Sequence, residues 1–352
     1  MECTLERYTD YLLSTTKAAT ATGMSELFDG ELSHDKVTRF LSESYFDSST
    51  VWSKAKPLVR KYESEEEGVL IADDSIAEKA HTDENAMISW HWDHSLGRNV
   101  KGINFVSLVY NSGELSVPVN VHLIEKTEGY VEKKTGKTKY RSAMTKNEIT
   151  RQMLLQAQSQ RILYRYFLAD SWFSSAETMN FVNDTLKKHY IMAVEKSREV
   201  ALSEEDKLQG RFQRVDTIDY PKNGSSMRVY LRSVKHPVAL VRQVFTNKDA
   251  SQGILYLVSN DTTLNSESMT TIYKKRWRVE EYHKSVKQHT ALTKSPTKTI
   301  QTQANHLYAS FVAYIKLEAM KLNSGMNHFA IKASLIAVAT KAAFLALRQL
   351  SA

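Results

Sequence analysis

Apolar residues recur at helical spacing in the first part of the chain, where one stretch predicts two short helices in succession. Within residues 1–62, the second of these helices begins near Ser33, after a turn at Asp29-Gly30. Lys36 and Arg39 fall on its exposed side. This layout is compatible with a helix-turn-helix that uses these two cations, and equally with a plain helical hairpin.

Short apolar runs replace the helical spacing after residue 68 and alternate with helical segments as far as about residue 195. The runs at 69–72 and 166–169 are typical of buried strands. The segments 103–111 and 117–124 predict a hairpin. We therefore expect three antiparallel strands, followed by strands that alternate with helices.

A basic segment follows the predicted hairpin. It includes Lys137 and Lys139, which are candidates for phosphate contacts. Thr145 and Glu148 then form a capping box, which predicts the start of the next helix.

Helical periodicity disappears after residue 195, and four segments there are typical of β-strands separated by turns such as Asn223-Gly224. The chain later returns to helix, with alanine-rich packing faces towards its end. We predict an α/β (α+β) protein whose third part is a β-rich insertion. The predicted parts are 1–62, 63–195, 196–263, 264–299 and 300–352.

The composition favours an acidic partner, because the 352 residues carry a formal net charge of +7. Cys3 is the single cysteine, which excludes a disulfide framework and favours an intracellular protein. The N-terminal segment MECTLERYTD lacks the apolar core of a signal peptide. The apolar stretch from Leu307 to Leu322 contains Lys316 and Glu318, so we expect no membrane segment.

Four polar side chains of the segment TIYKKRWRVEEYHKSVKQ share one face of a predicted helix: Tyr273, Arg276, Glu280 and Lys287. At about 100° per residue they fall within roughly 60° of one another. A carboxylate flanked by two cations and a phenol suits a metal-bound phosphodiester better than a core. A single Arg–Glu pair at this spacing, however, commonly decorates a solvated helix.

Two aspartates each follow one of the apolar runs. Asp73 ends the run at 69–72, and Asp74, its neighbour on the strand, is expected to point the other way. Asp170 ends the run at 166–169, before a helix that opens at Ser174 or Ser175. Carboxylates at strand ends are suited to hold a metal ion, and equally to cap the segment that follows.

Together these motifs resemble the DDE transposases of the bacterial insertion-sequence-four type. The pattern Y-x2-R-x3-E-x6-K at 273–287 is similar to the YREK signature of that family. Asp73-Asp74-Ser75 is similar to its first motif, and Asp170-Ser171-Trp172-Phe173 to its second. The resemblance implies an RNase H-like catalytic domain with a β-rich insertion and helical N- and C-terminal regions.

The resemblance also implies that Asp73, Asp170 and Glu280 are the catalytic and metal-binding residues. They would hold two Mg²⁺ ions about 3.5–4 Å apart, with Mn²⁺ as a substitute. Glu281 is the rival acid, but it lies about 100° away from the stripe.

Double-stranded DNA, as element ends and as target, is the partner that the resemblance implies. Tyr273, Arg276 and Lys287 would bind it near the cut, and Lys36, Arg39, Lys137 and Lys139 are further candidates. The expected enzyme binds the inverted repeats of its element, cleaves DNA and joins 3′-ends to target DNA as a homodimer. It would act in the bacterial cytoplasm, at the nucleoid.

Two alternatives stay open. One is an RNase H-like metal-dependent nuclease that cuts DNA but does not join it. The other is a DNA-binding protein with a decayed site, although the presence of all three acids and both cations argues against decay.

One further cluster runs from Trp90 to His94 and contains His91 and Asp93. Its spacing fits no standard zinc site. We expect a loop beside the active site that touches DNA through aromatic and cationic side chains, and a plain structural loop is an equal alternative.

Overall fold

The computed structural model describes the chain except for residues 94–95, 222–223, 247–249 and 351–352. His94 and Asn223, which belong to a predicted cluster and a predicted turn, therefore lie outside the described residues.

A five-stranded unit lies at the centre of a larger mixed sheet. The strands are β1 (Val69–Glu78), β3 (Arg98–Ser112), β4 (Leu115–Leu123), β7 (Tyr166–Ala169) and β8 (His189–Val194). β1 and β4 each pair antiparallel with β3, whereas β1, β7 and β8 run parallel. Three antiparallel strands joined to two parallel ones are the arrangement of an RNase H-like domain. The predicted fold is confirmed.

The first strand is longer than its apolar run predicted. β1 does not end at Asp73 but continues to Glu78, because β3 pairs with it along its whole length. β7 ends at Ala169, opposite Ala72, so only one side of β1 is covered beyond that point. A gap therefore opens in the sheet beside Asp73.

The expected loop at Trp90–Asp93 is instead a strand, β2 (Ile88–Asp93), which pairs antiparallel with β3. Its side chains alternate between more covered and more exposed positions, as on a strand with one solvated face. The polar composition of the segment concealed this alternation.

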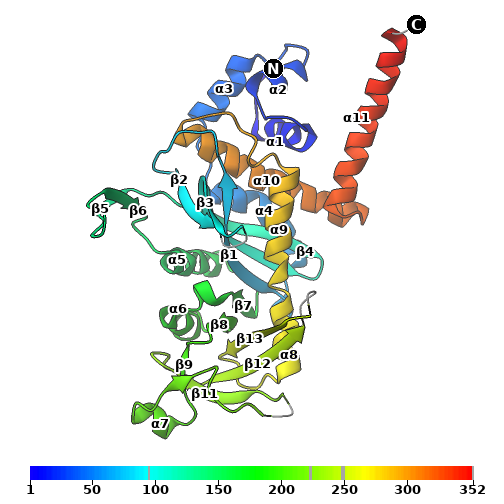
Figure 1. Ribbon diagram of the computed structural model, residues 1–352. Helices are drawn as coiled ribbons and strands as arrows, with labels where there is room; N and C mark the ends of the chain where they lie inside the picture. Colours follow the sequence, from blue (N-terminus) through cyan, green and yellow to red (C-terminus); the bar gives the residue numbers. More distant parts are fainter. Residues whose placement is uncertain (94–95, 222–223, 247–249, 351–352) are drawn as a thin grey trace.

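Helices cover the two faces of the central unit. α4 (Ser48–Tyr62) and α10 (Ile300–Ser324) pack against β4, and α5 (Lys146–Ser159) packs against β3 and β4 (Figure 1). Thr145 and Glu148 form the predicted capping box of α5. Ser175 caps α6 (Ala176–Asn180), after a short turn η1 (Ser171–Phe173) and before the π-helical turn η2 (Phe181–Thr185).

Three N-terminal helices form a second, smaller core with α10. They are α1 (Leu5–Ser14), α2 (Ala21–Glu26) and α3 (His34–Glu43). The predicted turn lies at Asp29 and Gly30, whose φ angles of 48° and 82° are left-handed, and Ser33 is the N-cap of α3. The Tyr8 hydroxyl lies 2.9 Å from Nδ1 of His306 on α10. The N-terminal helices are thus anchored on the C-terminal part of the chain.

The predicted insertion extends the main sheet. Its strands are β9 (Glu199–Ala201), β10 (Gln213–Arg214), β11 (Met227–Leu231), β12 (Val238–Thr246) and β13 (Gln252–Ser259). β13 pairs antiparallel with β8, which continues the catalytic sheet without a break. One short helix, α7 (Glu204–Leu208), was not expected, and Ser203 caps it. Separately, β5 (Glu128–Val131) and β6 (Thr138–Arg141) form a hairpin that stands away from the body (Figure 1).

The helix predicted to carry the polar stripe is divided in two. α8 (Ser266–Lys274) and α9 (Trp277–His289) are joined by a tighter turn. There Arg276 N donates to Tyr273 O at 2.9 Å, and Val279 N donates to Arg276 O at 3.1 Å. These i→i+3 bonds shift the angular positions that regular α-helical spacing predicted.

The last helix, α11 (His328–Leu350), departs from expectation. It extends away from the body instead of packing against it, and Phe329, Val338 and Leu347 are each more than half exposed (Figure 1). Among the described residues it is the one helix long and apolar enough to cross a membrane, with 6% of its apolar window buried. The stretch Leu307–Leu322, weighed above as a span, lies largely buried in α10. The expected absence of a membrane partner stays a prediction.

Candidate active site

The parallel register of two strands brings the two predicted aspartates together. Ala72 pairs with Ala169, so Asp73 and Asp170 are the next residues on neighbouring strands. α9 packs against β1 and supplies Glu280. All three carboxylates line one cavity of about 950 Å³. The structure thus gathers the three acids from positions far apart in the sequence.

Arg276 lies among these acids. Its Nη1 is 3.3 Å from Glu280 Oε1 and 4.0 Å from Asp73 Oδ2, and its side chain is only 17% exposed. Glu281 faces away and pairs with Arg278 at 2.9 Å. Glu280 is therefore the acid of this helix that faces Asp73.

The crowded carboxylates favour protonation in the absence of a cation. Burial raises the pKa of Asp73 well above its usual range, and the negative charges of Asp170, Glu280 and Asp74 raise it further. Burial also raises the pKa of Asp170, against the opposing charge of Arg276. Such a cluster of hard oxygen donors is suited to a divalent cation, which would stabilise the ionised forms.

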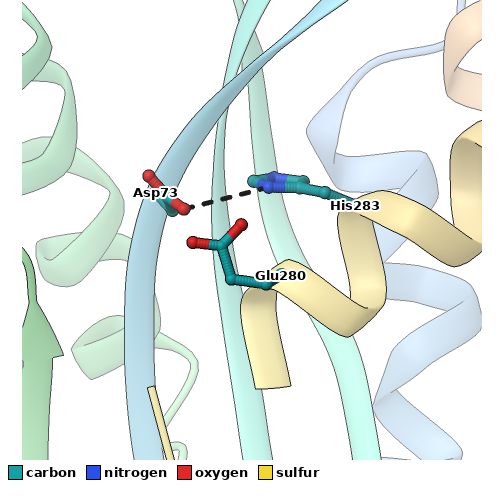
Figure 2. Close-up of side chains that lie close together, drawn as sticks. All are labelled: Asp73, Glu280 and His283. Atoms are coloured by element: carbon teal, nitrogen blue, oxygen red, sulfur yellow. Dashed lines mark ion pairs between the residues drawn. The ribbon is translucent and has the colours of Figure 1, made fainter. Parts of the chain in front are cut away.

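His283 is a residue of this centre that our sequence reasoning missed. It lies one turn beyond Glu280, and its Nδ1 is 3.9 Å from Asp73 Oδ2 (Figure 2). One ligand atom from each of Asp73, Glu280 and His283 lies within 4.8 Å of the others. Burial lowers the pKa of His283 to about 3, and the positive charges of Lys287 and Arg276 act in the same direction. The spacing Glu-x-x-His was the available signal.

Tyr273 and Lys287 take different positions. Tyr273 is 8% exposed, and its hydroxyl donates to the carbonyl of Ala169 at 3.3 Å, so it supports the backbone just before Asp170. Lys287 lines the cavity. Burial lowers its pKa, and nearby carboxylates partly oppose this effect.

Asp74 lines the same cavity as Asp73, contrary to the expectation that it would point the other way. Its Oδ2 accepts hydrogen bonds from Lys146 Nζ at 2.6 Å and from Asn104 Nδ2 at 2.9 Å. Beyond the end of β7 both sides of β1 are accessible, which accounts for the difference.

The structure does not bring the remaining predicted cations to the acids. Lys36 and Arg39 are exposed on α3, where Lys36 Nζ donates to Met1 O at 3.0 Å and Arg39 lies 3.9 Å from Glu43. Lys137 and Lys139 belong to the exposed β5–β6 hairpin, and Lys139 pairs with Glu132. Contact of these residues with DNA stays a prediction.

Residues 2–214 match the family described as DDE superfamily endonuclease. The chain belongs to this endonuclease family. The match covers Asp73 and Asp170, and Glu280 lies beyond it. Use of divalent metal by DDE endonucleases agrees with the donor set described above.

Two further comparisons were made for this DDE endonuclease. A comparison with curated proteins finds no match. Among solved structures, a chain of the Drosophila P element transposase strand transfer complex is similar, at 11% identity and a TM-score of 0.23. The alignment covers 48% of this chain and 34% of that one, so the chain spans about a third of that relative's length.

Proposed function

We propose that this DDE endonuclease is a DNA transposase of the insertion-sequence-four type. It would bind the inverted repeats of its element, cleave DNA at the element ends and join the 3′-ends to target DNA. The observation that carries the proposal is the meeting of Asp73, Asp170 and Glu280 in one cavity, with Arg276 and Lys287 beside them. These acids and cations are the ones that the sequence motifs singled out.

In this proposal Asp73, Asp170 and Glu280 hold divalent metal, for which Mg²⁺ is the expected ion. When bound, the metal would activate a hydroxyl nucleophile and stabilise the oxygen that leaves the phosphorus. Tyr273 holds the end of β7, and with it Asp170, through its hydrogen bond to Ala169. Arg276 keeps Glu280 directed towards Asp73.

The rim of the cavity supplies groups that suit a nucleic-acid strand. Trp90, Trp92 and Trp172 line it and are 52%, 53% and 60% exposed, which leaves ring surface for stacking on bases. Lys284 and Lys287 also line it and would meet phosphates. We therefore propose that DNA approaches along β2, over the opening of the cavity.

Recognition of the element ends is assigned in this proposal to α3 and the β5–β6 hairpin. Lys36 and Arg39 on α3, and Lys137 and Lys139 on the hairpin, are exposed cations outside the cavity. Two protomers would hold two ends in one synapse at the bacterial nucleoid. Because the N-terminal helices share a core with α10, deleting residues 1–62 would damage the fold. Surface substitutions such as Lys36→Ala with Arg39→Ala are the sharper test.

The decisive experiment uses labelled DNA that carries the inverted repeats flanking the gene of this protein. We expect the wild-type protein with Mg²⁺ to cut the repeats and to join the labelled 3′-ends to a target plasmid. Glu280→Gln should retain end binding and lose both reactions. Glu281→Gln is the matched control, because Glu281 carries the same group one position away and pairs with Arg278 outside the centre. It should react normally.

Each other outcome selects a different reading. Cleavage without joining favours the RNase H-like nuclease. End binding without cleavage at any divalent metal favours a decayed DNA-binding protein. A gene without flanking inverted repeats, or equal loss of activity in both variants, refutes the proposal.

A further inference from the structure

His283 is held at the acidic centre by its packing. Its side chain is 7% exposed, and the ring packs edge-to-face on Phe105, with centroids 5.7 Å apart. Tyr282 contacts it from the side, with a centroid separation of 5.1 Å. In Figure 2 the ring projects from α9 towards Asp73, next to the carboxylate of Glu280. The imidazole is thus fixed in direction before any ligand binds.

The polar atoms of this ring are left without ordinary partners. Nδ1 faces Asp73 Oδ2 at 3.9 Å, which is too long for a hydrogen bond. Nε2 is buried and has no hydrogen-bond partner among the residues that the structure describes. Burial of an unpaired polar atom costs free energy, so the arrangement requires an explanation.

Another buried histidine of the same protein shows what a structural role looks like. His306 Nδ1 lies 2.9 Å from the Tyr8 hydroxyl, and its Nε2 lies 2.9 Å from the carbonyl oxygen of Ala291. Both of its ring nitrogens are therefore satisfied by protein atoms. His283 is equally enclosed but lacks such partners, so packing alone does not account for it.

The separation of the donor atoms matches what a cation needs. Ligands of one ion, each about 2.0–2.2 Å from it, lie roughly 3–4 Å apart. The Nδ1–Oδ2 distance of 3.9 Å falls in this range, and the three donors of Asp73, Glu280 and His283 lie within 4.8 Å of one another. An imidazole nitrogen and a carboxylate oxygen that face each other without a shared proton are both electron-pair donors. A positive ion between them would join them.

We propose that His283 is a nitrogen ligand of the metal ion that Asp73 and Glu280 hold. The inference rests on the proposed function, which assigns metal to these acids, and it adds a ligand and a metal preference. Imidazole is a borderline-soft donor that Mn²⁺, Co²⁺ and Zn²⁺ accept more readily than Mg²⁺ does. This site therefore binds Mn²⁺ more tightly than Mg²⁺, and Asp170 remains available for a second ion.

The test measures metal binding without any reaction. Mn²⁺ is titrated into the purified full-length protein, its affinity is followed by electron paramagnetic resonance, and pulsed measurements detect coupling to a ligating ¹⁴N nucleus. We expect nitrogen coupling in the wild-type protein and its loss in His283→Gln, with Mn²⁺ affinity lowered about tenfold or more. His91→Gln is the matched control, because His91 lines the same cavity but lies 3.0 Å from Ser89 Oγ. It should keep the coupling.

Asp73→Asn separates the two proposals. Mn²⁺ binding that depends on Asp73 but shows no nitrogen coupling in the wild-type protein overturns the role of His283 and leaves the proposed function standing. Nitrogen coupling that persists in His283→Gln also overturns it. Mn²⁺ binding that is absent, or unchanged in Asp73→Asn, overturns both. The wild-type spectrum decides the question even where His283→Gln does not fold.

Discussion

Arg276 stands in the place where the acidic centre most needs a positive charge, so its removal is the most informative perturbation of the site. Arg276→Met keeps much of the aliphatic stem and deletes the guanidinium. Without the cation, Asp73 and Glu280 lose the ion pairs at 4.0 and 3.3 Å and repel each other across a partly buried cavity. We expect the metal-free variant to be less stable than the wild-type protein.

The magnitude follows from distance and exposure. At 3.3 Å and an effective dielectric constant of about 20, two unit charges attract by about 5 kcal/mol. Desolvation offsets most of this gain. Breaking a fully buried pair costs about 3–5 kcal/mol, and an exposed pair contributes about 0–1 kcal/mol. Because the Glu280 side chain is 40% exposed and that of Arg276 17%, we expect a loss of about 2 kcal/mol.

Urea unfolding with EDTA and with saturating Mg²⁺ measures this effect. A bound divalent ion compensates the same carboxylates, so the deficit of Arg276→Met should shrink when Mg²⁺ is present. Arg278→Met is the matched control. Arg278 also pairs with a glutamate of α9, but that pair is 39% and 53% exposed, so its loss should cost less than about 1 kcal/mol. Equal deficits with and without Mg²⁺ would show that Arg276 does not substitute for a cation.

Three further predictions test the neighbouring features. Asp73→Asn should abolish cleavage yet raise stability at pH 7: the raised pKa of Asp73 means that its ionisation destabilises the folded state, so the gain should shrink as the pH falls towards about 3.9, as thermal melts across this range would show. Tyr273→Phe should cost about 1 kcal/mol in urea unfolding and slow cleavage, with DNA affinity unchanged, and weaker DNA binding would contradict its buried position. Replacement of residues 128–141 by a short Gly-Ser linker should leave the melting temperature nearly unchanged and reduce the salt dependence of DNA binding by about 0.9 in slope per lost phosphate contact; an unchanged slope would exclude the hairpin from binding.

Local patterns were sufficient for the parts of the centre that depend on one segment. The apolar run before Asp170 identified β7 because all four residues of that strand are buried. Glu280 was separable from Glu281 because neighbouring residues on a helix point about 100° apart. Both inferences needed only the geometry of a single strand or helix.

Features that depend on partners distant in the sequence were beyond such patterns. The extension of β1 past Asp73 comes from its pairing with β3, which the residues of β1 do not encode on their own. The role of Asp74 follows from the early end of β7. His283 carried a usable signal in its spacing from Glu280, but a lone histidine on a helix is usually read as packing. The exposed state of α11 was missed because an alanine-rich helix normally finds a neighbour.

The order of strands in the sheet also dictates when this centre can form during synthesis. β8 has an open edge until β13 pairs with it, and Glu280 leaves the ribosome about 200 residues after Asp73. At about 5–20 residues per second, this interval lasts roughly 10–40 s. A nascent chain therefore carries both aspartates and an unprotected strand edge well before it has a complete set of carboxylates. Catalytic competence and protection from misassociation arrive together, once the segment from β13 to α9 has emerged.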